Sequence, residues 1–285
     1  MRSEALGAPL ADLAENAARI EREREKRYGY LSEAAEALVR RLSEDGEGQS
    51  PEALFASAAA DPIPLSAEDR VDFAALFLRA AARALGHTLS LSDLPDGPRP
   101  LGGRFRTVRL DNPLAEAAYL RFLPLLTQPT CHTRQSLFEL CDDVENGYAD
   151  YAVLPLFADG VAIPSVAALL EERGLAIAAA LTLPSHEGEL VFGLVSAAPV
   201  LLRPPTHFFF RYRPEGEEGL PALLSALSHL SLEILYLDTL PAPYGERAML
   251  RILVRAEEEV LLQLYSYLAL YAPTSVGYGF YTELS

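Results

Sequence analysis

The chain opens with apolar residues that recur at the spacing of an α-helix. Leucine, alanine and isoleucine return at three- and four-residue steps through residues 6–20 and again through residues 31–42, the pattern of a helix with one apolar face. Residues 21–27, between these stretches, mix acidic and basic side chains and indicate a solvated helix face. The start of the chain is therefore predicted to be helical.

Two shorter helices are predicted behind this stretch. Pro51 opens the first, over residues 51–60. Ser66 fits the N-cap of the second, whose apolar face covers residues 71–85 and which stops at Gly86. Residues 1–95 are thus expected to form a helical region.

A linker rich in proline and glycine leads into a region where strand and helix patterns alternate. Ser136 and Glu139 are spaced as a capping box, and Gly147 can close the helix in the left-handed conformation. The predicted strands are residues 104–110, 150–154, 175–183 and 189–196, and the predicted helices are residues 113–126, 136–146 and 164–173. This alternation predicts a small α/β lobe over residues 104–198.

The remaining residues, 206–285, have the pattern of a ferredoxin-like unit. The predicted order is strand, helix, strand, strand, helix, strand, over residues 206–213, 219–230, 231–238, 247–255, 257–270 and 275–282. The fold class is therefore α+β or α/β: an N-terminal helical region, a small α/β lobe and a C-terminal βαββαβ domain.

Composition narrows the range of partners. The 285 residues carry 40 acidic and 24 basic side chains, a net charge of −16, which argues against a nucleic acid or an anionic membrane as partner. No apolar run has the length of a membrane-spanning helix, and we expect a cytoplasmic protein. The two cysteines and five histidines lack the spacing of a metal site, so no metal and no cofactor are expected.

One segment in the middle of the chain resembles a known family. Residues 144–155 read Val-Glu-Asn-Gly-Tyr-Ala-Asp-Tyr-Ala-Val-Leu-Pro, and residues 136–140 read Ser-Leu-Phe-Glu-Leu. These segments are similar to the helix start and the Val-x-x-Gly-x-Ala-Asp-x-x-Val-x-Pro motif of prephenate dehydratases. The resemblance implies that the lobe is half of a periplasmic-binding-like dehydratase domain, and that residues 206–285 are an ACT-like regulatory domain.

The sequence departs from that family where its chemistry is expected. Residues 155–159 read Pro-Leu-Phe-Ala-Asp in place of Pro-Ile-Glu-Asn-Ser, and residues 111–115 lack the glycines of the family's opening loop. The strand at residues 189–192 has neither the Thr nor the Arg of the Thr-Arg-Phe motif. The interval between this strand and the preceding one is too short for the family's second lobe. The resemblance thus implies impaired catalysis.

The candidate site residues fall into two sets. Thr133, Arg134 and Ser136 precede a predicted helix, where they either bind a carboxylate or, for Ser136, only cap the helix. The resemblance to ACT domains implies ligand-binding roles for Asp238 and Thr239, with Leu240 in place of that motif's Arg. It also implies such roles for Gly219 and Leu220, which are loosely similar to the family's Gly-Ala-Leu. Asp238 and Thr239 otherwise cap a loop.

Three functions follow from this reading. The favoured one is a regulatory or ligand-sensing protein of phenylalanine biosynthesis that binds prephenate or phenylalanine and forms a homodimer through the ACT-like domain. The second is an active prephenate dehydratase, which converts prephenate to phenylpyruvate, water and carbon dioxide using Thr133, Arg134 or Ser136. The third is chorismate mutase activity in the helical region, although the chain's one lysine, Lys26, lies in the charged run.

Overall fold

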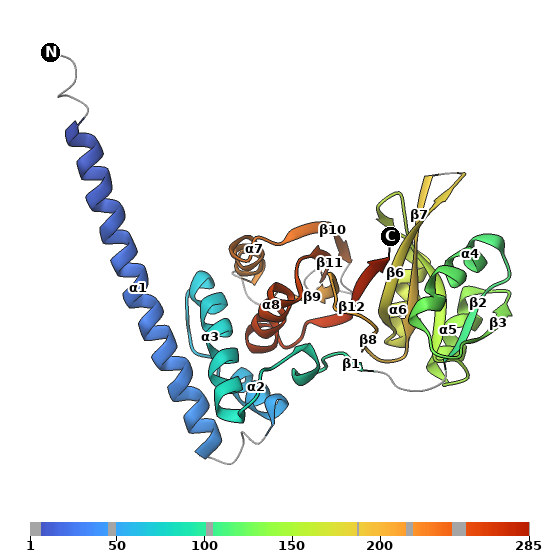
Figure 1. Ribbon diagram of the computed structural model, residues 1–285, viewed down its shortest axis with the longest axis horizontal. Coiled ribbons are helices and arrows are strands. Elements are labelled where there is room, and N and C mark those ends of the chain that lie inside the picture. The colour runs from blue at the N-terminus through green and yellow to red at the C-terminus, as the bar shows by residue number, and fades with distance from the viewer. Residues whose placement is uncertain are drawn as a thin grey trace.

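The structure is a computed structural model that describes residues 7–44, 50–100, 105–186, 188–214, 219–240 and 249–284. Residues 101–104 and 241–248, where the sequence predicts the beginnings of two strands, lie outside this set. Figure 1 shows a projecting N-terminal helix, a layer of two further helices and one long mixed sheet that carries helices on both faces. The predicted fold class is confirmed.

The helical region consists of α1 (Gly7–Glu44), α2 (Pro51–Ala60) and α3 (Ala67–Leu85). Ser66 caps α3 through the backbone N–H of Asp69, and Gly86 ends it with a φ of 78°, as the sequence predicts. The described side chains of α1 are buried only from Leu31 onward, where they pack on α3. α3 in turn packs on the helices of the ferredoxin-like unit.

The lobe is a sheet of five main strands and one short added strand, with helices on both sides. Its elements are β2 (Arg106–Leu110), α4 (Pro113–Phe122), β3 (Thr130–Arg134), α5 (Leu137–Glu145), β4 (Tyr151–Ala158), β5 (Val161–Ala162), α6 (Pro164–Arg173), β6 (Ala176–Ser185) and β7 (Gly188–Ser196). The strand order is β3-β2-β4-β7-β6, with β2 parallel to β3 and β4, and β7 antiparallel to both neighbours. β5 extends β4 as a short hairpin.

A tight hairpin joins β6 to β7. Ser185 pairs with Gly188 at its tip, in the interval where the resemblance to prephenate dehydratases implies an inserted second lobe. The interval between β6 and β7 is therefore too short to hold a second lobe.

The ferredoxin-like unit contains β9 (His207–Tyr212), α7 (Gly219–His229), β10 (Glu233–Leu240), β11 (Met249–Arg255), α8 (Glu258–Tyr271) and β12 (Val276–Leu284). Its strands lie in the order β10-β11-β9-β12, which is the arrangement of a split double β-α-β unit. α7 and α8 pack on one face of these strands, and α3 packs on these two helices.

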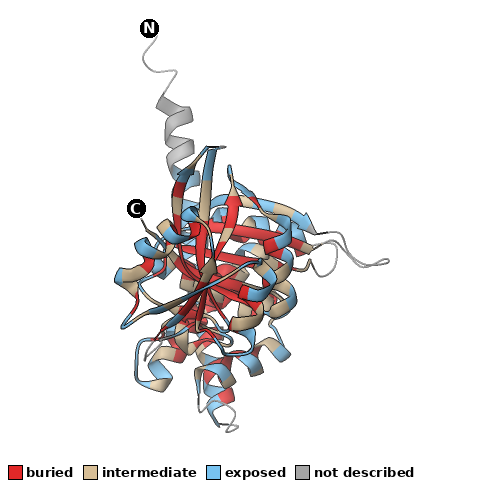
Figure 2. Cartoon of the chain, turned by 90° about the vertical axis from the view of Figure 1, so that its right-hand side faces the viewer, coloured by how far each residue is buried: buried red, intermediate tan, exposed pale blue. Residues whose placement is uncertain are grey.

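The lobe and the ferredoxin-like unit share one continuous sheet. Residues Thr282 to Leu284 of β12 pair in parallel with Ala179 to Leu181 of β6; we call this pairing the seam. One apolar cluster runs across the seam, from Leu154 in the lobe to Phe209 and Tyr278 in the ferredoxin-like unit. Figure 2 shows buried residues along the strands at the centre of the molecule. The two units therefore form a single packed body.

Gly279 makes the seam possible. It has a φ of 144°, and a Cβ built at this position would lie 2.2 Å from the carbonyl oxygen of Ile177 in β6. Only glycine adopts this backbone conformation readily, and only a residue without a side chain allows the two strands to approach so closely.

Three features were not predicted from the sequence. β3 is an edge strand made of mostly exposed polar residues, without the alternation that marks a half-buried strand. The expected linker packs in part: Leu94 is buried, and β1 (Arg99–Pro100) pairs with β8 (Val200–Leu201). β4 continues beyond Leu154 to Ala158.

Among the described residues, no helix combines the length and the apolar character that crossing a membrane requires.

We expect Gly279→Ala to destabilise the protein by at least about 2 kcal/mol, because it adds both backbone strain and an overlap with Ile177. Gly29→Ala is the control, since a Cβ at residue 29 of α1 meets nothing within 4 Å and alanine favours a helix. Urea unfolding of both variants measures the difference. Equal stability of the two variants would show that the seam does not depend on Gly279.

Candidate ligand-binding site

A hollow lies on the lobe where β2, β4 and β6 present their carboxyl ends; we call it the lobe pocket. Its volume is about 700 Å³. Its lining residues come from the β2–α4 turn, from β4, from the tip of the β6–β7 hairpin and from β7: Leu110, Asn112, Pro113, Leu114, Pro155, Pro184, Ser185, His186, Leu190 and Phe192. Ligands of α/β folds collect at this edge of the sheet.

The amino end of α4 borders the lobe pocket. Asn112 accepts a hydrogen bond from the N–H of Ala115 at 2.8 Å and so caps the helix, and Pro113 occupies its first turn. The free backbone N–H groups of a first turn and the helix dipole favour an anion at this place. Most other lining residues are apolar. The pocket therefore suits a ligand with an apolar body and one carboxylate.

The tip of the β6–β7 hairpin is held in place by Asp159, which follows β4. The Asp159 carboxylate accepts a hydrogen bond from the N–H of Glu189, and the two residues also bond through their backbones, each at 2.9 Å. Gly188 has a φ of 128°, a backbone conformation that other residues rarely adopt, and a Cβ there would come 2.0 Å from the same carboxylate. The wall that carries Ser185 and His186 is thus anchored to β4.

The end of β4 is apolar where prephenate dehydratases are polar. Leu156 and Phe157 are 3% and 4% exposed, and the ring of Phe157 packs 5.6 Å from that of Tyr236 in the ferredoxin-like unit. Neither a carboxylic acid nor an arginine is found among the described residues that line the lobe pocket. The described lining therefore lacks the strong acid and the cation that would assist the loss of water from a dianion.

The first set of predicted residues lies outside this lining. Ser136 caps α5, and Glu139 completes the capping box. The Arg134 guanidinium pairs with Asp143 at 2.8 Å, and Thr133 is exposed on the edge strand β3. The structure thus gives Ser136 and Arg134 local structural partners. The catalytic role of these residues stays a prediction.

The second set of predicted residues is divided between the two faces of the sheet. Asp238 contacts Arg251 at 2.5 Å and accepts a hydrogen bond from the Tyr236 hydroxyl at 3.0 Å, on the face that meets the lobe. Gly219 lies at the start of α7, on the opposite face, where its carbonyl accepts a hydrogen bond from Tyr212.

Neighbouring residues of the second set are exposed. Thr239 is exposed on β10, and Leu220 is 38% exposed on α7. The structure therefore does not gather the four residues, Asp238, Thr239, Gly219 and Leu220, around one hollow. Their role in binding stays a prediction.

The Arg251 guanidinium lowers the pKa of the Asp238 carboxyl, and the Tyr236 hydroxyl adds to this effect. Arg251 is only 7% exposed, and its Nε has no hydrogen-bond partner among the described residues. Asp238 is thus the counter-charge of a buried arginine.

His186, Leu190 and Phe192 were missed at the sequence level. His186 lies in the short interval between two predicted strands, and Leu190 and Phe192 lie on the second of them, where the resemblance places a catalytic motif that this chain lacks. The short spacing between these two strands could have indicated the pocket wall. A tight hairpin after a strand parallel to β4 must lie at the same sheet edge as the β2–α4 turn.

Comparisons with known proteins identify the fold. No family model matches the chain, and no curated protein matches it. Among solved structures, prephenate dehydratase from Streptococcus mutans matches with a TM-score of 0.53 at 12% identity, over 64% of this chain and 100% of that chain. The protein thus shares its fold with that dehydratase; an identity this low shows the fold alone.

Two further structures match less closely. A protein described as a novel type of quorum-quenching acylase has a TM-score of 0.48 at 20% identity, over 63% of this chain and 95% of that chain. Prephenate dehydratase from Arthrobacter aurescens, in complex with L-Phe, has a TM-score of 0.48 at 12% identity, over 62% and 90%.

We expect Asp238→Asn to lower stability by about 1–2 kcal/mol, because it leaves Arg251 without its counter-charge; the loss stays below that of a fully buried pair because Asp238 is 38% exposed. The Asp238 pKa is lowered in the folded state, so its contribution is present at neutral pH and lost as the pH falls below about 4. Urea unfolding at pH 7 and pH 3 measures both effects. Thr239→Ala, at an exposed neighbour, should change stability by less than about 0.5 kcal/mol.

Proposed function

We propose that the protein is a cytoplasmic ligand-sensing relative of prephenate dehydratases that serves phenylalanine biosynthesis without catalysing dehydration. The lobe pocket takes a small monocarboxylate with an apolar or aromatic body, and phenylalanine is the first candidate. The supporting observation is the pocket itself: an apolar hollow of about 700 Å³ that meets the amino end of α4.

The lining of the pocket favours binding over dehydration. Prephenate carries two carboxylates, and its conversion to phenylpyruvate needs donors for both of them and an acid for the departing oxygen. The described lining offers one helix end, Asn112, Ser185 and His186. With no second lobe over the β6–β7 hairpin, the pocket also stays open to water, which weakens electrostatic stabilisation of a transition state.

The helical region gives no support to a chorismate mutase. Lys26 lies on the exposed side of α1 and pairs with Glu23 at 3.7 Å. Arg27, on the same helix, donates hydrogen bonds to Asp69 and Ser66. Both side chains thus have structural partners.

We expect phenylalanine to raise the melting temperature of the protein and Leu114→Glu to abolish the rise. Leu114 is 36% exposed in the first turn of α4 and lines the pocket, so a glutamate there repels a bound carboxylate while it still suits the helix dipole. Ligand at one hundred times its Kd stabilises the folded state by about 2.7 kcal/mol, which a thermal-shift measurement detects.

Leu120→Glu is the matched control, since Leu120 lies on the same helix, is 56% exposed and is not part of the lobe pocket. This variant should keep the ligand response. A flat response of the wild type to phenylalanine, phenylpyruvate and prephenate would reject the sensing function. If the protein forms phenylpyruvate from prephenate faster than buffer alone does, it catalyses dehydration, and that part of the proposal is wrong.

We also propose a homodimer through the ferredoxin-like unit. β10 is the last strand of the sheet on this side. Leucine and isoleucine side chains on β10 and α7 form an exposed apolar edge, with exposed fractions of 38–46%: Leu220, Leu224, Ile234 and Leu237. The opposite edge strand, β3, is polar. A long apolar strand edge invites pairing with another chain, whereas a polar edge discourages it.

We expect Leu224→Glu to halve the assembled mass measured by light scattering, because it places a charge in the apolar edge. Leu120→Glu, with the same change on another exposed helix position, should leave the mass unchanged. An unchanged mass in Leu224→Glu would show that the apolar edge is not the dimer interface.

A further inference from the structure

A second hollow lies where the helical region meets the ferredoxin-like unit; we call it the junction pocket. Its volume is about 580 Å³, a size that suits a small molecule. Its lining comes from the end of α2, the connection from α2 to α3, α3 itself, and the neighbouring parts of β9, α7 and α8. It shares no described residue with the lining of the lobe pocket, so the two hollows are separate sites.

The charge of the junction pocket is opposite to that of the chain. The chain has a net charge of −16, yet the described lining of this hollow contains two arginines, Arg70 and Arg213, and no acidic residue. The field of an acidic protein repels an anion over most of the surface, whereas a basic hollow attracts it. The carboxyl end of α8 borders the hollow and offsets part of the positive charge. One negative charge therefore matches the hollow better than two.

Arg70 lies in the wall of the hollow without a carboxylate partner. It is half-buried in the first turn of α3, and its Nε donates a hydrogen bond to the carbonyl of Leu65 at 3.0 Å. Its guanidinium carbon lies 5.5 Å from the centroid of the Tyr271 ring. Among the described residues, no acidic side chain forms an ion pair with it. A partly buried cation is stabilised by a counter-charge, and a bound anion can supply one here.

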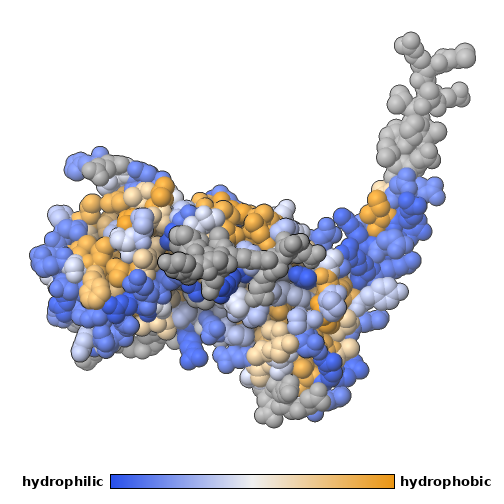
Figure 3. Space-filling model, turned by 180° about the vertical axis from the view of Figure 1, so that it is seen from behind, coloured by the Kyte–Doolittle hydropathy of each residue, from blue (hydrophilic) through white to orange (hydrophobic). Residues whose placement is uncertain are grey.

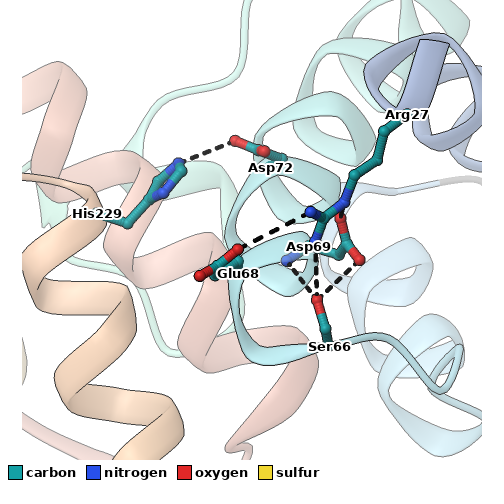
Figure 4. A network of polar contacts seen from close by, with 6 residues as sticks. All are labelled: Arg27, Ser66, Glu68, Asp69, Asp72 and His229. Atoms are coloured by element: carbon teal, nitrogen blue, oxygen red, sulfur yellow. Dashed lines mark hydrogen bonds and ion pairs between the residues drawn. The ribbon is translucent and has the colours of Figure 1, made fainter. Parts of the chain in front are cut away.

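The acids that neighbour Arg70 on α3 are engaged elsewhere. Figure 4 shows that the Asp69 carboxylate accepts a hydrogen bond from Arg27 and that Asp72 pairs with His229, at 3.0 Å. These contacts hold both carboxylates at the junction of α3 with α1 and α7. The protein itself therefore leaves Arg70 available to a ligand.

Two tyrosines of α8 complete the polar part of the wall. Tyr267 is 2% exposed, and the hydroxyl of Tyr271 is buried without a hydrogen-bond partner among the described residues. Burial raises the pKa of both tyrosines, and the nearby Arg70 guanidinium opposes this rise. The hydroxyls thus stay protonated and can donate a hydrogen bond. A buried hydroxyl without a partner is unfavourable until it finds an acceptor, and a carboxylate oxygen is such an acceptor.

Most of the remaining described lining is apolar, with Ile63, Ala222 and Leu270 among its residues. In Figure 3 the projecting helix is largely hydrophilic, whereas hydrophobic residues reach the surface at its base, in the helical region. A ligand in the junction pocket can therefore bury an apolar body beside its charged group.

We propose that the junction pocket binds a small monocarboxylate with an apolar body, and that its carboxylate lies between the Arg70 guanidinium and the Tyr271 hydroxyl. This site goes beyond the function proposed for the lobe pocket and does not depend on it. Because the helical region and the ferredoxin-like unit both contribute to the wall, the ligand also stabilises the contact between them.

Calorimetric titration with benzoate tests the site, in a Leu114→Glu background so that the lobe pocket does not contribute. We expect benzoate to bind, and Arg70→Gln to weaken this binding by about tenfold or more, because it removes a charged hydrogen-bond donor. Arg79→Gln is the matched control: it removes the same charge from the same helix, but Arg79 is exposed and does not line the hollow. Its affinity should stay within about twofold, because solvent and salt screen exposed charges.

Tyr271→Phe is a second variant, which separates binding from folding. Because it removes an unpaired buried hydroxyl, the ligand-free protein should unfold at the same or a higher urea concentration, while benzoate binds about threefold or more weakly. A lower urea midpoint would show that the hydroxyl has a structural partner, and would overturn its role as a ligand donor.

Two further probes test the chemical class of the ligand. Benzyl alcohol has the same ring without the charge, and inorganic phosphate has the charge without the apolar body. Both should bind at least about tenfold more weakly than benzoate, because each lacks one of the two groups that the hollow recognises. The proposal is overturned if benzoate does not bind, if Arg70→Gln and Arg79→Gln lose equal affinity, or if either probe binds as tightly as benzoate.

Discussion

The structure depends on the close approach of β12 to β6. The last residues of the described chain complete the lobe sheet, and Gly279 lets β12 pass over the carbonyl of Ile177. Near this crossing His207 stacks on Tyr281, with 5.1 Å between the ring centroids, and its burial lowers its pKa. Because β6 reaches the lobe pocket at its carboxyl end and pairs with β12 at Ala179 to Leu181, the pocket and the ferredoxin-like unit are parts of the same body.

The lobe pocket has the location that is usual for a binding site in this architecture. It lies at the carboxyl ends of the strands, where ligands of this architecture bind. Apolar residues such as Leu156 and Phe157 occupy the end of β4, and they contribute to the core that holds the two units together. The end of β4 therefore contributes to packing between the two units, and the ligand-sensing function proposed above rests on the lobe pocket alone.

The two edges of the long sheet differ in kind. The edge at β10 and α7 is apolar and lies on the sheet, so it suits a side-by-side contact. The opposite edge strand, β3, is polar and mostly exposed, which discourages such a contact.

The sequence by itself determined the types of the elements and the order of the ferredoxin-like unit, because caps such as Ser66 and Ser136, closing glycines such as Gly147 and apolar periodicity act within a few residues. Only the tertiary structure decided the edge strand β3, the seam, the partners of Arg134 and Asp238, and the lining of the lobe pocket. Each of these depends on residues far apart in the chain, such as Ala179 and Thr282, and no local pattern specifies which distant strand or charge a residue will meet.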